Sequence, residues 1–306
     1  MPDAVGAGFE LKMPTATTIQ EACAWVMAQG LSRLEMQMLT LYALGQKPQN
    51  RAWLLTHDTD ALPESCWSAL QSCVHRRLQG EPVAYITGNK EFYGLRLQVD
   101  KRVLDPRDDT ETLVDWALEL GGNPSAPHRI VDLGTGSGAI ALALKHRQPH
   151  WQITAVDYSA DALAVAQANA LRLGLDVHFA HGNWLANIEG TFNFIVSNPP
   201  YIAAGDTHLA ALTHEPLKAL ASGPDGLDDI RTIIAQAPEH LAPGGWLLLE
   251  HGYDQAVAVR SLLCAAGLHD AQSRCDLAGI ERCSGARLAR TLDTARINDQ
   301  IDLQTP

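Results

Sequence analysis

VDLGTGSG, residues 131–138, ends a short apolar run and begins a stretch with helical character. Around it, short apolar runs alternate with segments of about 10–15 residues that have the length of helices. Strands are predicted at 129–133, 152–157, 176–180, 192–197 and 245–250, with two weaker ones near 268–275 and 286–290. This alternation is typical of a parallel sheet with helices on both faces, and the two weak strands are expected to form an antiparallel edge.

The glycines of this stretch predict a ligand-binding turn. Glycine has no Cβ, so the backbone can turn tightly and come close to a ligand, while the free N–H groups at a helix start attract a negative group. Asp157 ends the next predicted strand. A carboxylate there is placed to accept both hydroxyls of a ribose. The competing interpretation is a tight turn without a ligand, and the acid at the strand end weakens it.

The loop departs from the GxGxxG spacing of dinucleotide-binding proteins. With the preceding Asp132 it resembles the loop of class I S-adenosylmethionine methyltransferases. That resemblance implies that the loop follows the methionine part of the cofactor and that the turn after the third strand lies beside the adenine. Asp132 either orients the cofactor's amino group or braces the loop. The implied cofactor-binding residues are Gly134, Thr135, Gly136, Ser137, Gly138, Asp157, Asn183 on the adenine amine, Trp184 over its face, and Asn198.

A second motif, NPPY at 198–201, follows the fourth predicted strand. Two prolines form a rigid turn at the carboxyl edge of the sheet, where open α/β sheets bind ligands. The Asn198 side-chain oxygen and the Pro199 carbonyl can accept both N–H bonds of a planar amino group, on which Tyr201 can stack. Methyl transfer from a sulfonium then needs mostly positioning and electrostatics. The motif therefore predicts an amino-methyltransferase whose acceptor is a planar NH2 group.

Further segments resemble the HemK-type enzymes, the peptide chain release factor glutamine N5-methyltransferases. They are GEPVAYITG at 80–88, EFYGL at 91–95, VLDPR at 103–107, TETLV at 110–114, HEPLKAL at 214–220 and LLLEHG at 247–252. The resemblance covers about residues 18–290. It implies an α/β fold: a Rossmann-like class I methyltransferase sheet, mostly parallel with an antiparallel edge, a small N-terminal helical bundle that docks the release factor, and a β-hairpin linker.

The resemblance also implies an activity. A methyl group is transferred from S-adenosyl-L-methionine to the glutamine amide nitrogen (N5) of the GGQ motif in bacterial class I release factors. The cofactor product is S-adenosyl-L-homocysteine. The implied catalytic residues are Asn198, Pro199 and Tyr201, and the implied substrate-binding residues are Asn198, Pro199, Pro200 and Tyr201. Alternatives are a glutamine N5-methyltransferase of a ribosomal protein, an amino-methyltransferase of DNA or ribosomal RNA, and a cofactor-binding scaffold without activity.

Composition narrows the partners. The 306 residues carry a net charge of −12, which repels phosphate, so we expect a protein substrate and no direct contact with nucleic acid. No apolar run is long enough to span a membrane, and no signal peptide is visible. The six cysteines lack CxxC spacing, so neither a metal site nor a disulfide is expected. We expect a cytoplasmic monomer.

The predicted organisation has five parts. They are a flexible leader at 1–17, a helical substrate-docking domain at 18–85, a β-hairpin linker at 86–108, the methyltransferase domain at 109–291 and a flexible tail at 292–306. Within the helical domain, Ser32 and Glu35 predict a capping box. The helix that follows is predicted to bury Leu34, Met38, Leu41 and Tyr42.

Three places depart from the family pattern. Asp105 and Asp108 flank Arg107, and we expect them to pair with it and hold it away from a substrate. Asn183 stands where Asp is usual, which predicts weaker cofactor binding at most. Residues 283–286, CSGA, are irregular against the usual ending.

Overall fold

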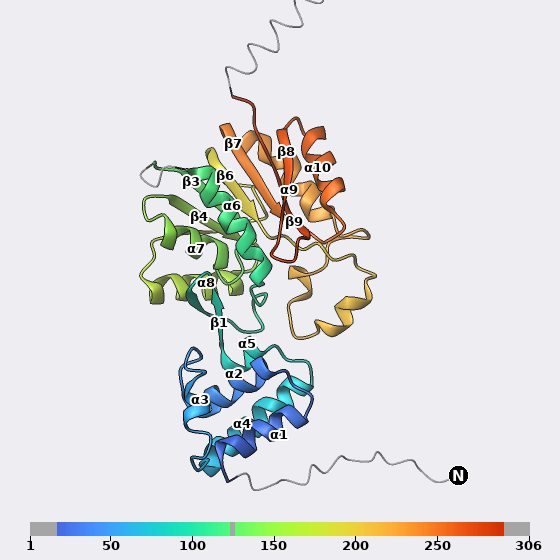
Figure 1. Ribbon diagram of the computed structural model, residues 1–306. Coiled ribbons are helices and arrows are strands. Elements are labelled where there is room, and N and C mark those ends of the chain that lie inside the picture. The colour runs from blue at the N-terminus through green and yellow to red at the C-terminus, as the bar shows by residue number, and fades with distance from the viewer. Residues whose placement is uncertain (1–16, 123–125, 291–306) are drawn as a thin grey trace, which may run out of the picture. The chain divides into compact units, whose positions relative to one another are not determined.

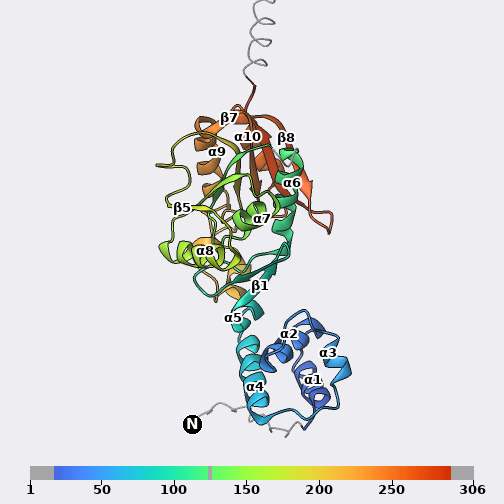
Figure 2. The same ribbon diagram turned by 90° about the vertical axis from the view of Figure 1, so that its left-hand side faces the viewer.

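The computed structural model describes residues 17–122 and 126–290. The chain divides after Thr87 into two compact units, a helical one and an α/β one (Figures 1 and 2). The predicted leader at 1–17 lies outside the described residues except for Thr17, and the predicted tail at 292–306 lies wholly outside them. No helix among the described residues has both the length and the apolar character needed to cross a bilayer.

The described part of the first unit, from residue 17 on, is built from five helices. They are α1 (Ile19–Ala28), α2 (Arg33–Ala43), α3 (Trp53–Thr56), α4 (Glu64–Leu78) and α5 (Val83–Thr87). Capping boxes begin α1 and α2, because Thr18 and Ser32 each accept a bond from the backbone of the glutamate three residues on. The box predicted at Ser32 and Glu35 is therefore confirmed. The core joins Val26, Leu39, Trp67 and other apolar side chains of α1, α2 and α4.

One predicted helix face is right for Leu41 and wrong for Leu34 and Tyr42. Leu34 and Tyr42 of α2 are 48% and 46% exposed, whereas Leu39, Thr40 and Leu41 are buried. Three consecutive buried residues do not form one stripe; they arise because α2 contacts α1, α4 and α5 on different sides. The short helix α5 was not predicted; its residues 83–85 fall in the segment assigned to the helical domain and 86–87 in the segment assigned to the linker.

The second unit begins with a hairpin and continues as an α/β sheet. The hairpin strands are β1 (Asn89–Phe92) and β2 (Leu95–Gln98). The sheet strands are β3 (Arg129–Leu133), β4 (Gln152–Asp157), β5 (His178–His181), β6 (Phe192–Ser197), β7 (Leu241–Glu250), β8 (His269–Cys275) and β9 (Glu281–Arg287). Their order in space is β5-β4-β3-β6-β7-β9-β8, and only the pairings of β9 are antiparallel. The predicted Rossmann-like sheet with an antiparallel edge is confirmed.

Helices cover both faces of this sheet. They are α6 (Glu111–Gly121), α7 (Ala139–Arg147), α8 (Ala160–Leu173), α9 (Asp228–His240) and α10 (Ala256–Ala265), with short 3-10 turns η1 (Asp108–Thr110), η2 (Thr207–Ala211) and η3 (Leu217–Ala219). Figure 1 shows α6 and α7 on one side of the sheet and α9 and α10 on the other. Val131, Ile195 and Leu247, paired across β3, β6 and β7, pack on Ile233 of α9 and Val259 of α10.

The strand order predicts where a ligand would bind. From β3 the chain proceeds to β4 and β5 on one side, and then crosses to β6 and β7 on the other. Helices leave β3 and β6 in opposite directions at such a reversal, so a crevice opens beyond the carboxyl ends of these strands. Both sequence motifs follow these two strands, the glycine loop after β3 and the Asn-Pro-Pro-Tyr segment after β6.

Candidate active site

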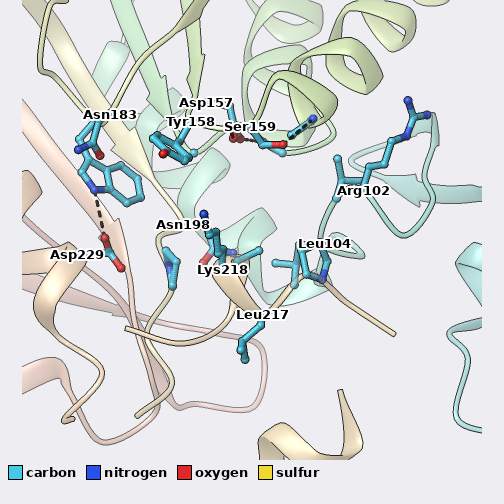
Figure 3. Close-up of a pocket in the computed structure, with 18 of the residues that line it drawn as sticks. Arg102, Leu104, Asp157, Tyr158, Ser159, Asn183, Asn198, Leu217, Lys218 and Asp229 are labelled. Atoms are coloured by element: carbon cyan, nitrogen blue, oxygen red, sulfur yellow. Dashed lines mark hydrogen bonds between the residues drawn. The ribbon is translucent and has the colours of Figure 1, made fainter. Parts of the chain in front are cut away.

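Four turns at the carboxyl ends of neighbouring strands line one cavity of about 670 Å³. They follow β3, β4, β5 and β6, which are adjacent in the sheet. Figure 3 shows Asn198 near the middle of this cavity, with Asn183 and Asp229 on one side and Arg102 and Leu104 on the other. The predicted residues that line it are Gly134, Gly136, Asp157, Asn183, Trp184, Asn198 and Pro200.

Asp157 holds the glycine loop and faces the cavity. Its Oδ2 accepts the backbone N–H of Gly136 at 2.8 Å, and its Oδ1 accepts that of Ser159 at 2.8 Å. Burial raises the pKa of the Asp157 carboxyl, while these N–H bonds act in the opposite direction. Gly134 and Gly136 have φ of 69° and 57°, a conformation that favours glycine. The loop is thus bent so that its backbone borders the cavity.

The other three predicted loop residues lie behind this surface. Thr135 and Ser137 are buried, and neither they nor Gly138 line the cavity. Thr135 donates its hydroxyl to Asp132 at 2.6 Å. Gly138, with φ of 85°, begins α7, and a Cβ there would come 3.0 Å from a methyl carbon of Leu142. These residues shape the loop from below.

Asp132 braces the loop, which was one of its two predicted roles. It is fully buried, and its Oδ2 accepts bonds from the Thr135 hydroxyl and from the backbone N–H of Ala141 at 3.2 Å. Its Oδ1 has no hydrogen-bond partner among the described residues. Burial raises the pKa of Asp132 to about 7. The side chain does not line the cavity.

Trp184 closes one end of the cavity. Its backbone has a φ of 54°, unusual for a bulky residue. The indole N–H donates to Oδ1 of Asp229 at 3.2 Å, the dashed bond to Asp229 in Figure 3. A Cβ on Gly134 would come 3.2 Å from the Trp184 ring. The ring therefore lies against the glycine loop, and Asp229 fixes its orientation. Asp229 was not predicted; it is the second residue of α9, far from either motif in sequence.

Tyr158 and Lys218 also line the cavity and were missed. The Lys218 ammonium lies 5.2 Å from the centre of the Tyr158 ring, which is within cation–π range. Tyr158 directly follows Asp157, so its position after a strand end was the available signal. Lys218 belongs to η3 in the long segment after the Asn-Pro-Pro-Tyr motif.

A second, smaller cavity of about 150 Å³ borders the same motif. Pro199 and Tyr201 line it, together with Leu104, Arg107, Ile202 and other residues. Asn198 lines both cavities. Leu104 and Ala219 also line both, so the two cavities are neighbours, and Asn198 is the residue of the motif that they share.

Beneath the motif lies a buried polar network that the sequence did not reveal. The Asn198 side-chain N–H donates to the hydroxyl of Thr110 at 3.0 Å. Thr110 in turn is hydrogen bonded to Glu250, and the Tyr201 hydroxyl donates to Oε1 of Glu250 at 3.4 Å. Glu250 is 1% exposed. It ends the apolar run of β7, and an acid at the end of a buried strand was the same signal that pointed to Asp157.

Arg107 forms the predicted ion pair with Asp105, but its shortest ion pair is with Glu215, which was not predicted. Its guanidinium donates to Oε1 of Glu215 at 2.6 Å, while the nearest Asp105 oxygen is 3.9 Å away. Asp108 pairs with Lys90 at 2.8 Å instead. The expected pairing with Asp108 is wrong, because η1 begins at Asp108 and turns its side chain outward, where it is 82% exposed. Among the described residues, no group of three or more His, Cys, Asp or Glu side chains is placed to hold a metal ion.

Comparisons with known proteins show which family the chain is similar to. Residues 118–223 match the family model of the methyltransferase small domain, and residues 19–88 match that of the PrmC N-terminal domain. The chain is 48% identical to the release factor glutamine methyltransferase of Bordetella pertussis over 85% of this chain and 96% of that protein. It is 45% identical to that of Coxiella burnetii, over 83% and 91%. A methyltransferase structure from Pyrococcus furiosus, 18% identical, covers 70% of this chain and 97% of its own with a TM-score of 0.50, and supports the fold alone.

Proposed function

The chain belongs to the release factor glutamine methyltransferase family, and on that basis we propose that it methylates the glutamine amide nitrogen (N5) of the GGQ motif in bacterial class I release factors. The methyl donor is S-adenosyl-L-methionine. The observation that carries the proposal is the position of Asn198, which lines both the larger and the smaller cavity. An amide in the smaller cavity is thereby brought against a methyl donor in the larger one.

The larger cavity fits the methyl donor. Its volume of about 670 Å³ is in the range of small-molecule sites. Asp157 would accept the ribose hydroxyls, Gly134 and Gly136 would border the methionine part, and Trp184 with Asn183 would hold the adenine. Thr135, Ser137 and Gly138 would contribute by shaping the loop. When bound, the cofactor supplies an electrophilic methyl group on a positively charged sulfur.

The smaller cavity fits a primary amide. The nitrogen lone pair of an amide is delocalised, so the nitrogen is a weak nucleophile until it is oriented. Asn198 Oδ1 and the Pro199 carbonyl would accept its two N–H bonds, and Tyr201 would stack on its plane, with Pro200 holding the turn rigid. Burial raises the pKa of the Tyr201 hydroxyl, so this ring stays neutral. After transfer the amide nitrogen loses one proton to water, and no general base is required.

The partners follow from the family. The release factor is the protein substrate, and the helical unit, whose residues 19–88 match the PrmC N-terminal domain, would dock it. The net charge of −12 supports a protein substrate over a nucleic acid. We propose a monomer that acts in the cytoplasm, where release factors work.

Mass spectrometry tests the proposal directly. A release factor containing GGQ is incubated with the protein and S-adenosyl-L-methionine, with ribosomal protein and ribosomal RNA present as competitors. One methyl group on the GGQ glutamine, lost with Asn198→Ala and kept with Asn50→Ala in the helical unit, is the expected result. A methyl group on a competitor alone would overturn the choice of substrate.

A further inference from the structure

Thr110 is the hydrogen-bond partner that fixes which way the Asn198 amide faces. An asparagine amide has a donor end and an acceptor end of nearly equal shape. Only the end that carries Oδ1 can accept an N–H bond of the substrate. Asn198 donates its N–H to the Thr110 hydroxyl at 3.0 Å, which leaves Oδ1 for the substrate. The reverse orientation would place the amide N–H bonds against those of the substrate.

A threonine hydroxyl has a single proton, and Glu250 determines where that proton goes. Thr110 is 3% exposed and hydrogen bonded to Glu250. When Glu250 is a carboxylate, the Thr110 hydroxyl donates its hydrogen bond to it. The Thr110 oxygen can then only accept a hydrogen bond from Asn198. If Glu250 instead donated to Thr110, the hydroxyl proton would be released to Asn198, and the amide would turn its N–H bonds outward. The direction of the whole chain of bonds therefore depends on Glu250 being an acceptor.

We propose that Thr110 and Glu250 are positioning residues that hold Asn198 with its oxygen, rather than its nitrogen, facing the acceptor amide. Glu250 also accepts a bond from the Tyr201 hydroxyl at 3.4 Å, so one buried carboxylate orients two side chains of the motif. This inference rests on the proposed methyl transfer to an amide. It differs from that function in assigning a role to two residues outside the Asn-Pro-Pro-Tyr segment.

The surroundings of Glu250 make its charge sensitive to pH. Burial raises the pKa of Glu250 to about 7. Of the charged groups that face it, Asp109 from η1 raises this pKa and Arg282 from β9 lowers it, while hydrogen bonds from Thr110 and Tyr201 favour the carboxylate. The nearby Cys283 thiol is buried and has a raised pKa, so it stays neutral. Glu250 is thus an acceptor above about pH 7 and gains a donor proton below it.

The first test removes the Thr110 hydroxyl. Thr110→Val keeps the shape of the side chain but can neither accept from Asn198 nor donate to Glu250. The maximal rate of release factor methylation is expected to fall by about tenfold to a hundredfold, as for a misplaced reacting group, with cofactor affinity unchanged. Thr110→Ser, which restores the hydroxyl, is expected to recover most of that rate. Thr40→Val, at a buried threonine of the helical unit, is the matched control.

The second test uses the pH profile and does not depend on the first variant folding. At saturating cofactor and substrate, the wild-type rate is expected to fall as pH drops through about 7, as Glu250 gains its proton. Glu250→Gln cannot titrate, so its rate is expected to be level between pH 6 and 8.

The outcomes separate the two proposals. If the wild-type protein does not methylate the release factor, the proposed function fails. If it does, while Thr110→Val keeps the wild-type rate or Glu250→Gln keeps the fall below pH 7, the positioning role is overturned and the function stands.

Discussion

The two halves of the site rest on buried acids that are used in opposite ways. Asp132 lies under the glycine loop and Glu250 under the Asn-Pro-Pro-Tyr turn, and burial raises the pKa of both to about 7. Each has one carboxylate oxygen without a hydrogen-bond partner among the described residues. Asp132 bonds only to positions three and nine residues away. Glu250 instead joins Thr110 and Tyr201, which come from distant parts of the chain.

The half of the site around the glycine loop is formed by local contacts, whereas the half around the Asn-Pro-Pro-Tyr turn is formed by tertiary contacts. The cofactor half is formed by a strand, a loop and a helix start that follow one another in sequence, so its shape is set within one short segment. The acceptor half forms only when η1, β6 and the end of β7 are brought together by the sheet. We therefore expect changes in the first half to alter cofactor binding, and changes in the second half to alter the rate of transfer.

The largest expected effect is in the acceptor half. Asn198→Ala removes the group that accepts a substrate N–H bond, and we expect the maximal rate to fall by about a hundredfold to a thousandfold, as when one preorganised polar contact is removed. Asn198 also borders the larger cavity, so cofactor affinity is expected to fall too, but by much less than the rate. Single-turnover kinetics with titration calorimetry checks both quantities. An equal loss in rate and in cofactor affinity would contradict the claim that the acceptor half mainly sets the rate of transfer.

The next effect lies in the cofactor half. Asp157→Ala removes the carboxylate that we propose faces the ribose, and we expect cofactor binding to weaken by about 1–3 kcal/mol, the range for a hydrogen bond to a charged group. Calorimetry with S-adenosyl-L-homocysteine measures the change. Asp176→Ala, at an exposed aspartate after α8, is the control. Unchanged affinity would remove Asp157 from the cofactor site.

Asp132→Asn tests the local brace through stability. With its pKa raised from 3.8 to about 7 in the folded protein, Asp132 binds a proton more tightly folded than unfolded. Its contribution to the free energy of unfolding is full below about pH 4 and is lost as pH rises to 7. The variant stays neutral, so the stability difference between pH 5 and pH 8 should shrink by about 1–3 kcal/mol. Urea unfolding followed by tryptophan fluorescence measures it, and an unchanged difference contradicts the assignment.

The smallest expected effect separates the ring of Tyr201 from its hydroxyl. The bond to Glu250 is long at 3.4 Å, so Tyr201→Phe is expected to keep the methylation rate within about threefold, the equivalent of a weak hydrogen bond. Tyr201→Ala also removes the stacking surface and should be slower than Tyr201→Phe. Steady-state rates at saturating substrate compare the two. Equal rates in both variants would mean that the ring does not position the amide.

Features that depend on local sequence were predicted well, and features that depend on tertiary contacts were not. The strands 129–133, 152–157 and 192–197 have the predicted bounds, because each is a short apolar run buried in the sheet. At the antiparallel end of the sheet, the edge strand β8 and its neighbour β9 are more polar, and β9 spans 281–287 rather than 286–290. Asp157 and Asn198 were found from motifs. Thr110 begins the TETLV segment of the family resemblance, but nothing near it in sequence indicated its partner Asn198, 88 residues away.

The ion pairs of Arg107 were predicted only in part, for the same reason: Asp105 does pair with it, but at 3.9 Å. The acids nearest to Arg107 in sequence were expected to neutralise it, but the closest oxygen belongs to Glu215, 108 residues away. The local sequence shows which charged residues are near Arg107 in the chain, but tertiary contacts determine which of the protein's acids lies closest to it. The face of α2 shows this for apolar residues, since its burial depends on three neighbouring helices.

The position of Asn198 between two cavities has a consequence for inhibitor chemistry. A nucleoside in the larger cavity and a small carboxamide in the smaller one would both lie against Asn198, so a short covalent tether can join them. Linking two ligands turns the second binding event into an intramolecular one, and the effective concentration of the second group reaches the millimolar range for short flexible tethers. A two-headed compound of this kind would bind more tightly than either half and would select for enzymes that hold both cavities side by side.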